Sequence, residues 1–190
     1  MLEKLIDIFI KFPGIGPRQA KRFAYFLAGQ NAKFIKNFSD LLLEIKKEIK
    51  QCPSCFRFFS GNQCEICTSV GRDKNILMIV EKDVDLENIE KSGIYNGKYF
   101  VLNGTLSLTN NHVDKLRFKE LFEKVKKEQP QEIIIALSVN PEGENTALYI
   151  IKILEPLSKK ITRLGRGLST GTELEYSDKD TIDNAFKNRH

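Results

Sequence analysis

Two groups of side chains in this sequence have the residue types and the spacing that chemistry requires. Four cysteines form two C-x-x-C pairs, CPSC and CEIC, separated by eight residues. Two glutamates, Glu142 and Glu144, stand one residue apart in PEGENTA, shortly after the apolar run IIIAL. The cysteines could bind a metal through sulfur, and the glutamates could hold a divalent cation or present negative charge to a partner.

The cysteines predict a structural zinc site, with the ligands Cys52, Cys55, Cys64 and Cys67. Each C-x-x-C pair can turn back so that both thiolates meet one ion, and two pairs supply the four sulfurs of a tetrahedral site. Because four thiolates leave no open coordination position, one zinc ion per chain would fold a segment too short to bury a core. The alternatives are disulfides, incidental thiols or an iron–sulfur cluster.

Acidic residues follow two expected strands. Glu81 comes directly after the run ILMIV, and the PEGENTA pair comes shortly after IIIAL. The carboxyl ends of parallel strands form one functional edge of a sheet, so Glu81, Glu142 and Glu144 could converge there, with Asp83 and Asp85 nearby. A trio of this kind can bind Mg²⁺. The alternative is that all of these are exposed loop carboxylates.

A nuclease or topoisomerase would also need a nucleophile or a positioned base. The sequence has two histidines, His112 and His190, and no local motif marks any of its five tyrosines as a nucleophile. GIYNGK, residues 93–98, resembles a P-loop, but it is one residue too short between its glycines, and Tyr99 stands where Ser or Thr would hold Mg²⁺. We therefore predict no nucleotide site.

The segment FPGIGPRQAKRF, residues 12–23, has the pattern of a helix–hairpin–helix. Its glycines allow a tight turn and close approach to another chain, and it leads into a helix whose first N–H groups favour a phosphate. Such a contact would read a nucleic-acid backbone and not base edges. The alternative is a hairpin that uses glycine for packing alone. The residues predicted to bind are Lys11, Gly14, Gly16, Arg18, Lys21 and Arg22.

Hydrophobic periodicity predicts the elements that position these residues. Residues 2–50 read as a helix from Leu2, a helix from Pro17, and then one helix or two short ones broken near residues 37–40. Alternation of strands with helices beyond residue 75 favours a mostly parallel sheet flanked by helices. Strands are expected at 76–80, 99–102, 132–139 and 160–164, and helices at 112–128, at 146–157 and from Lys179.

Composition limits the classes of protein that fit. The 190 residues are 41% hydrophobic and 29% charged, which is typical of a globular chain of one to three small domains. A net charge of +5 permits nucleic-acid binding without requiring it. No apolar run approaches the ~18 residues of a membrane span, and the N-terminus has no signal-peptide pattern. We expect a cytoplasmic protein with no membrane partner.

Taken in order, these motifs resemble the bacterial recombination mediator family RecR. The glycine hairpin is similar to the helix–hairpin–helix of that family, the cysteine motif to its zinc motif, and residues 80–107 with EGENTALY to its Toprim domain. Residues 162–189 are similar to its Walker B-like closing segment. The resemblance implies an α+β chain of four parts: 1–50, the helix–hairpin–helix; 51–71, the zinc finger; 72–165, the α/β Toprim domain with a mostly parallel sheet; and 166–190, an oligomerisation segment.

The resemblance also implies a function, that of a non-enzymatic mediator of recombinational DNA repair in the bacterial cytoplasm, at the nucleoid. Members of the family form dimers or ring-like tetramers that can encircle single- or double-stranded DNA without sequence preference. They act with RecO and RecF to load RecA onto gapped single-stranded DNA. Carried over to this chain, Arg18 and Arg22 would contact DNA, and the acidic residues Glu81, Glu142 and Glu144 would meet RecO.

The chain departs from the family pattern at ALSVNPEGE, at Phe100, and at residues 107–114, where the proline and glycines of the family loop are missing. Two other interpretations compete with the mediator. One is a small Mg²⁺-dependent Toprim nuclease, which the scarcity of histidine and the lack of a marked nucleophile disfavour. The other is a zinc scaffold that touches no nucleic acid.

Overall fold

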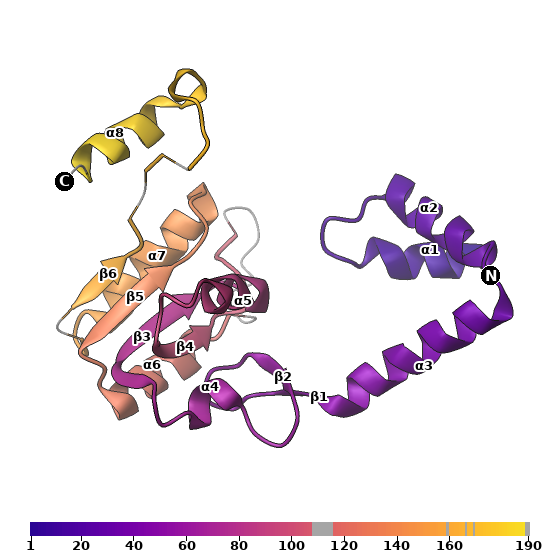
Figure 1. Ribbon diagram of the computed structural model, residues 1–190, viewed down its shortest axis with the longest axis horizontal. Helices are drawn as coiled ribbons and strands as arrows, with labels where there is room; N and C mark the ends of the chain where they lie inside the picture. The colour runs from indigo at the N-terminus through magenta and orange to yellow at the C-terminus, as the bar shows by residue number, and fades with distance from the viewer. Residues whose placement is uncertain (108–115, 159, 166, 169, 189–190) are drawn as a thin grey trace. The chain divides into compact units, whose positions relative to one another are not determined.

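The computed structural model describes residues 1–107, 116–158, 160–165, 167–168 and 170–188 (Figure 1). The chain divides into two compact units, Met1–Lys50 and Gln51–His190. None of the helices in the described part of the chain is long and apolar enough to cross a membrane.

The first unit consists of three helices, α1 (Leu2–Ile10), α2 (Pro17–Ala28) and α3 (Ala32–Glu48). Its small core is formed by Phe9, Ala20 and Ala24, with partly buried apolar residues of α1, α2 and the connection between them packed around it. The third helix runs unbroken through residues 37–40, and the Asn31 side chain caps its start by accepting a hydrogen bond from Phe34 N (2.9 Å). No residue of α3 is buried.

The second unit is built on a four-stranded sheet in the order β4-β3-β5-β6, and every strand pair is parallel, as predicted. Side chains alternate between the two faces of the sheet. In β3, Leu77 and Ile79 pack into one apolar cluster, and Met78 and Val80 into another. The strands are β3 (Asp73–Val80), β4 (Gly97–Val101), β5 (Glu132–Ala136) and β6 (Ile161–Arg163).

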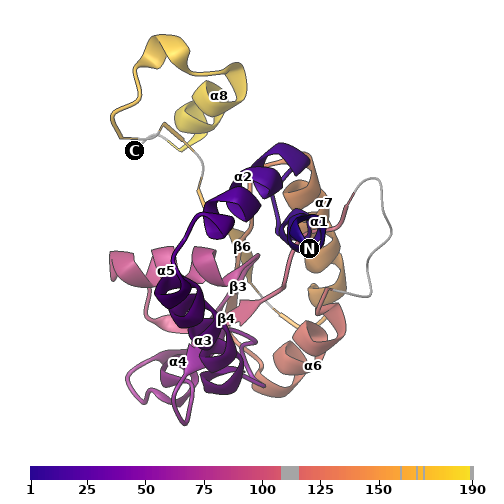
Figure 2. The same cartoon turned by 90° about the vertical axis from the view of Figure 1, so that its right-hand side faces the viewer.

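Helices cover both faces of this sheet. On one face α6 (Phe118–Glu128) and α7 (Pro141–Leu154) contribute buried residues to the cluster around Ile79. On the other face α5 (Asp83–Ser92) contributes Leu86 to the cluster around Val80, together with the cysteine segment. The view in Figure 2 shows α5 on one side of the strands and α6 and α7 on the other.

The cysteine segment contains β1 (Ile49–Gln51), which pairs with β2 (Phe58–Ser60), and the short helix α4 (Glu65–Thr68). The closing residues include a 3₁₀ turn, η2 (Leu174–Tyr176), and α8 (Lys179–Lys187), which starts where the sequence predicted. The side chain of Asp178 caps α8 by accepting a hydrogen bond from Thr181 N (2.9 Å).

Several elements differ from the sequence prediction. Helix α5, between the first two strands of the sheet, was not expected. Helix α7 begins at Pro141, five residues earlier than predicted, so PEGENTA is its first turns and not a loop. The predicted strand 132–139 ends at Ala136. The predicted helix 112–128 is observed from Phe118, and residues 112–115 lie outside the described residues, as does most of the departure at 107–114.

Candidate functional site

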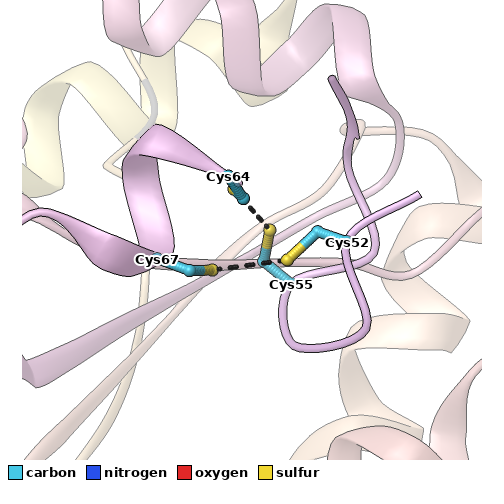
Figure 3. A group of neighbouring side chains, drawn as sticks. All are labelled: Cys52, Cys55, Cys64 and Cys67. Atoms are coloured by element: carbon cyan, nitrogen blue, oxygen red, sulfur yellow. Dashed lines mark hydrogen bonds between the residues drawn. The ribbon is translucent and has the colours of Figure 1, made fainter. Parts of the chain in front are cut away.

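The four cysteines come together as the spacing predicts (Figure 3). They are free, and their sulfur atoms all lie within 4.8 Å of one another. The Sγ atoms of Cys52 and Cys67 are 3.7 Å apart, as are those of Cys55 and Cys64. Zn–S bonds of about 2.3 Å in a tetrahedron place sulfurs roughly 3.8 Å apart, so this donor set fits a zinc ion.

Local backbone contacts make each pair turn back on itself. In the first pair, Phe56 N donates to Cys52 O (3.0 Å), and Phe56 adopts a positive φ of 63° that reverses the chain. In the second pair, Cys64 stands before the first residue of α4, and its carbonyl accepts from Thr68 N (3.0 Å) and Thr68 Oγ1 (3.0 Å). The hydrogen bond between Cys55 and Cys67 lowers the pKa of Cys67 and raises that of Cys55, so the metal-free pair favours a thiolate at Cys67 and a thiol at Cys55.

The cysteine segment is attached to the edge strand of the sheet and to α5. Val101 N of β4 donates to Cys55 O (2.9 Å), and Phe58 N of β2 donates to the Asp83 carboxylate (2.7 Å). One of the acidic residues considered for Mg²⁺ therefore holds β2 against the start of α5. The cysteine cluster and the sheet form one structural unit.

Glu81 lies at the carboxyl end of β3, as predicted, but it is buried, with 6% of its surface exposed. Its carboxylate accepts a hydrogen bond from Ser138 Oγ (2.8 Å) and an ion pair from Lys82 Nζ (2.7 Å). The hydrogen bond to Glu81 raises the pKa of Lys82, so the ammonium is held in its charged form. The cation beside this carboxylate is supplied by the chain itself.

The two glutamates of PEGENTA do not form a pair. Residues two apart on a helix point to different sides, so Glu142 and Glu144 in the first turn of α7 cannot chelate one ion together. Glu144 instead forms an ion pair with Arg163 of β6 (2.5 Å). The glycine between them is required by packing, since a Cβ on Gly143 would lie 1.9 Å from Ser138 O.

The acidic residues therefore do not converge as the sequence suggested. Across the described ranges, the four cysteines are the one group of three or more His, Cys, Asp or Glu side chains close enough to share a metal ion. Asp85, the remaining acid near this edge, accepts a hydrogen bond from Lys82 N at the start of α5 (2.9 Å). The acidic edge does not fit the Mg²⁺ site considered from the sequence.

The tyrosines nearest the sheet are poorly suited to nucleophilic attack. Tyr99 of β4 is fully buried, and burial raises its pKa. Burial likewise raises the pKa of Tyr95, whose hydroxyl donates to Lys98 O (2.8 Å). An attacking phenol needs the opposite shift or an adjacent base.

The glycine hairpin connects α1 to α2 in the first unit. Gly14 has a φ of +76°, which favours glycine, and Ile15 is packed against the small core. Gly16 precedes Pro17, the first residue of α2, and no side chain caps this helix N-terminus, so its first N–H groups face outward. All six predicted DNA-binding residues are exposed: Lys11, Gly14, Gly16, Arg18, Lys21 and Arg22.

Sequence reasoning missed three side chains at these sites. Lys82 and Ser138 bind Glu81, and Arg163 binds Glu144. A signal for the early start of α7 was present, because Asn140 followed by Pro141 is a typical helix start, and Asn140 Oδ1 accepts from Gly143 N (2.7 Å). No sequence signal marked Ser138 or Arg163 as partners, because they lie 57 and 19 residues from the glutamates that they bind. Lys82 is the neighbour of Glu81 in the chain, but the hydrophobic pattern does not indicate that the two side chains pair.

The parallel sheet with helices on both faces, together with the four-cysteine cluster, defines a class of protein: a Toprim-containing protein with a four-cysteine segment. Comparison with known proteins supports this class. Residues 75–165 match the family model described as Toprim domain. The chain is 39% identical to the recombination protein RecR of Dehalococcoides mccartyi over 189 residues, covering 99% of this chain and 93% of that protein. It is 37% identical to that of Lactobacillus helveticus over 187 residues, covering 97% and 94%.

A third relative, the recombination protein RecR of Staphylococcus aureus, is 36% identical over 189 residues, covering 99% of this chain and 96% of that protein. The similarity thus extends through the hairpin, the cysteine segment, the sheet and the closing segment. The chain belongs to the RecR family of recombination proteins.

Proposed function

We propose that this chain is a non-enzymatic recombination mediator that binds DNA through the glycine hairpin. The observation that carries the proposal is the hairpin itself, where an uncapped helix N-terminus and four exposed basic side chains lie within twelve residues. Outward N–H groups and basic side chains bind phosphates, and phosphate contacts give affinity without sequence preference. The same surface serves single- and double-stranded DNA.

The experiment that tests this proposal measures DNA affinity over a range of salt concentrations. The double variant Arg18→Glu/Arg22→Glu is expected to lose most of its affinity and to show a shallower salt dependence, because each lost phosphate contact lowers the slope by about 0.9 on duplex DNA. The matched control is Lys33→Glu/Lys36→Glu, which makes the same charge change on exposed positions of α3. An unchanged salt slope in the hairpin variant would refute the proposal.

The absence of an enzymatic role is supported by what the acidic residues do. Glu81 is neutralised by Lys82, Asp83 holds β2, and Glu144 is paired with Arg163. A metal-dependent nuclease would need these carboxylates to converge on an ion. Incubation with supercoiled and single-stranded DNA in Mg²⁺ or Mn²⁺ should give no cleavage, and cleavage that disappears in Glu142→Ala/Glu144→Ala would establish the enzyme instead.

In this proposal the acidic start of α7 is the docking surface for RecO. Glu142 and Glu144 are half-buried. Glu81 is buried, and its carboxylate accepts a hydrogen bond from Ser138, which lies shortly before the start of α7. RecF acts with RecO, and together they load RecA onto gapped single-stranded DNA at the bacterial nucleoid. Glu144→Lys should weaken RecO binding in calorimetry while DNA affinity stays unchanged, and equal RecO affinity would rule out this surface.

The mediator acts as a homo-oligomer, a dimer or a ring-like tetramer. Exposed apolar residues on α3 and in the closing segment, among them Leu43 and Tyr176, support this part of the proposal. The four cysteines hold one structural Zn²⁺ per chain. Sedimentation and metal analysis of the purified protein test the two statements directly.

A further inference from the structure

Lys98 has an unusual position for a lysine. It lies in β4, the edge strand of the sheet, and 9% of its surface is exposed. In the described part of the chain it is the one lysine or arginine whose whole residue, backbone included, is buried. Burying an ammonium is costly unless the surroundings compensate its charge, so its contacts need an explanation.

All contacts of the Lys98 ammonium lie in the second C-x-x-C pair and just after it. Nζ donates to Ile66 O (2.9 Å), Cys67 O (3.1 Å) and Ser69 O (3.3 Å). An ammonium has three donors, and these three carbonyls use all of them. Its hydrogen bonds are therefore satisfied by the backbone that carries one of the sulfur ligands.

Hydrogen bonds do not neutralise the charge. Among the residues that the structure describes, no carboxylate lies within ion-pair distance of Lys98 Nζ. Four thiolates around one Zn²⁺ carry a net negative charge, and the sulfur of Cys67 belongs to that cluster. In a poorly solvated site a nearby opposite charge is worth much more than in water. A loaded metal site would supply the counter-charge that no carboxylate of the described residues provides by an ion pair.

We propose that Lys98 is a positioning residue of the metal site, holding the second C-x-x-C pair against the sheet and offsetting the negative charge of the loaded cluster. The inference rests on the proposed zinc site. The contacts of Lys98 also link the metal site to the sheet, because Lys98 belongs to β4 and its ammonium binds the second C-x-x-C pair. Loss of the ion would leave a buried cation without its counter-charge in β4, next to the buried Tyr99.

Lys124 of α6 provides a matched control. Its side chain is 8% exposed and it touches the first C-x-x-C pair, where Nζ donates to Ser54 Oγ (2.9 Å). Its charge, however, is already paired with Glu128 (2.7 Å). Removing the Lys124 charge should disturb packing near the cysteines without removing the compensation of the metal cluster.

The experiment uses the full-length protein as wild type and as Lys98→Gln, Lys98→Arg and Lys124→Gln. Zinc affinity is measured by competition with a chromophoric chelator, and thermal unfolding is followed with zinc and after chelation. Lys98→Gln keeps hydrogen-bond donors but loses the charge, so its zinc affinity should fall roughly tenfold or more, the range seen for residues that support metal ligands. Lys98→Arg should stay closer to wild type, and Lys124→Gln should bind zinc like wild type.

Each remaining outcome counts against the proposal. Equal zinc affinity in wild type and Lys98→Gln would overturn it, as would a stability loss in that variant that is the same with and without zinc. If Lys98→Gln does not fold, Lys98→Arg decides the matter, because it keeps the charge. A zinc affinity of Lys98→Arg tenfold or more below those of wild type and Lys124→Gln would then overturn the proposal. Wild-type protein that binds no zinc would overturn the metal site itself, which separates the two failures.

Discussion

The two units of the chain bury their apolar residues to very different degrees. In Gln51–His190 the strands β3 and β4 have buried residues on both faces, and Ile79, Phe100 and Ile133 are fully inaccessible. In Met1–Lys50 the buried residues are Phe9, Ala20 and Ala24. The three leucines of α3 in this unit, Leu41, Leu42 and Leu43, are 52–63% exposed.

The difference in apolar burial indicates how each unit is stabilised. The sheet unit closes its core with its own helices and the four-cysteine cluster, while apolar residues of its closing segment such as Tyr176 stay exposed. The helical unit leaves a long apolar helix uncovered, and exposed apolar patches of this kind are typical of protein–protein contact sites. The contrast supports the proposal that copies of this chain associate, with DNA binding placed in the unit that is least complete by itself.

The largest expected effect comes from breaking the metal cluster. Cys64→Ser should abolish zinc binding and strongly destabilise the sheet unit, because structural zinc sites supply on the order of 10 kcal/mol of binding free energy to folding. Hydrogen exchange should accelerate in residues 51–71 and along β4, and zinc content should fall to zero. Ser60→Ala, at an exposed position of β2, is the control. Equal acceleration in α1 and α2 would contradict the separation of the two units.

A pair of leucine truncations compares the two units directly. Leu121 of α6 is fully buried, so Leu121→Ala should cost roughly 2–5 kcal/mol of unfolding free energy. Leu43 is 63% exposed, so Leu43→Ala should change the stability of the single chain by no more than about 0.5 kcal/mol. The second variant should instead weaken self-association in sedimentation experiments. A large stability loss at Leu43 under conditions where the protein is monomeric would show that α3 is covered within the chain.

Two glycine substitutions, one in each unit, test the difference between a glycine required by packing and a glycine in an open turn. A Cβ on Gly143 would meet Ser138 O at 1.9 Å, so Gly143→Ala should cost about 1–3 kcal/mol in denaturant unfolding. A Cβ on Gly16 would meet nothing within 4 Å, so Gly16→Ala should cost about 1 kcal/mol or less. The expected loss at Gly16 is in DNA affinity, since a methyl group there obstructs the approach of a phosphate. Unaltered DNA binding by Gly16→Ala would argue that the hairpin glycine serves only the turn.

The smallest expected effect is on the stability of the sheet unit at acidic pH. Burial alone would raise the pKa of Glu90, but hydrogen bonds from Arg72, including one from Nη1 (3.0 Å), outweigh it and lower the pKa below the ordinary 4.5. The pKa of Glu90 is lower in the folded than in the unfolded state. The stabilisation that the Glu90 carboxylate provides is therefore complete above the unfolded-state pKa and is lost as pH falls through the folded-state pKa. Glu90→Gln should therefore be less stable than wild type at pH 6 by about 0.5–1 kcal/mol, and the difference should shrink towards pH 3. A difference that stays constant with pH would assign the effect to packing.

Much of the fold could be predicted because its signals are local. The expected strands 76–80 and 132–139 contain short apolar runs, and they correspond to β3 and β5, although β3 starts at Asp73 and β5 ends at Ala136. Helix α5 escaped notice because its buried surface is small: it buries Leu86 and relies on Asp85 at its start and Gly93 at its end. Boundaries such as that of α7 were missed because a cap is a single side-chain contact, which periodicity does not register.

The clustering of the four cysteines and the parallel sheet could be predicted from the sequence, because cysteine spacing and hydrophobic period are properties of neighbouring residues. Only the tertiary structure decided what the acidic residues do. The partners of Glu81 and Glu144 include Ser138 and Arg163, which are 57 and 19 residues away along the chain. Strand order and register bring such residues together, and each of these carboxylates pairs with a cation or hydroxyl of the same chain. The same pairing of distant segments placed Lys98 beneath the cysteines.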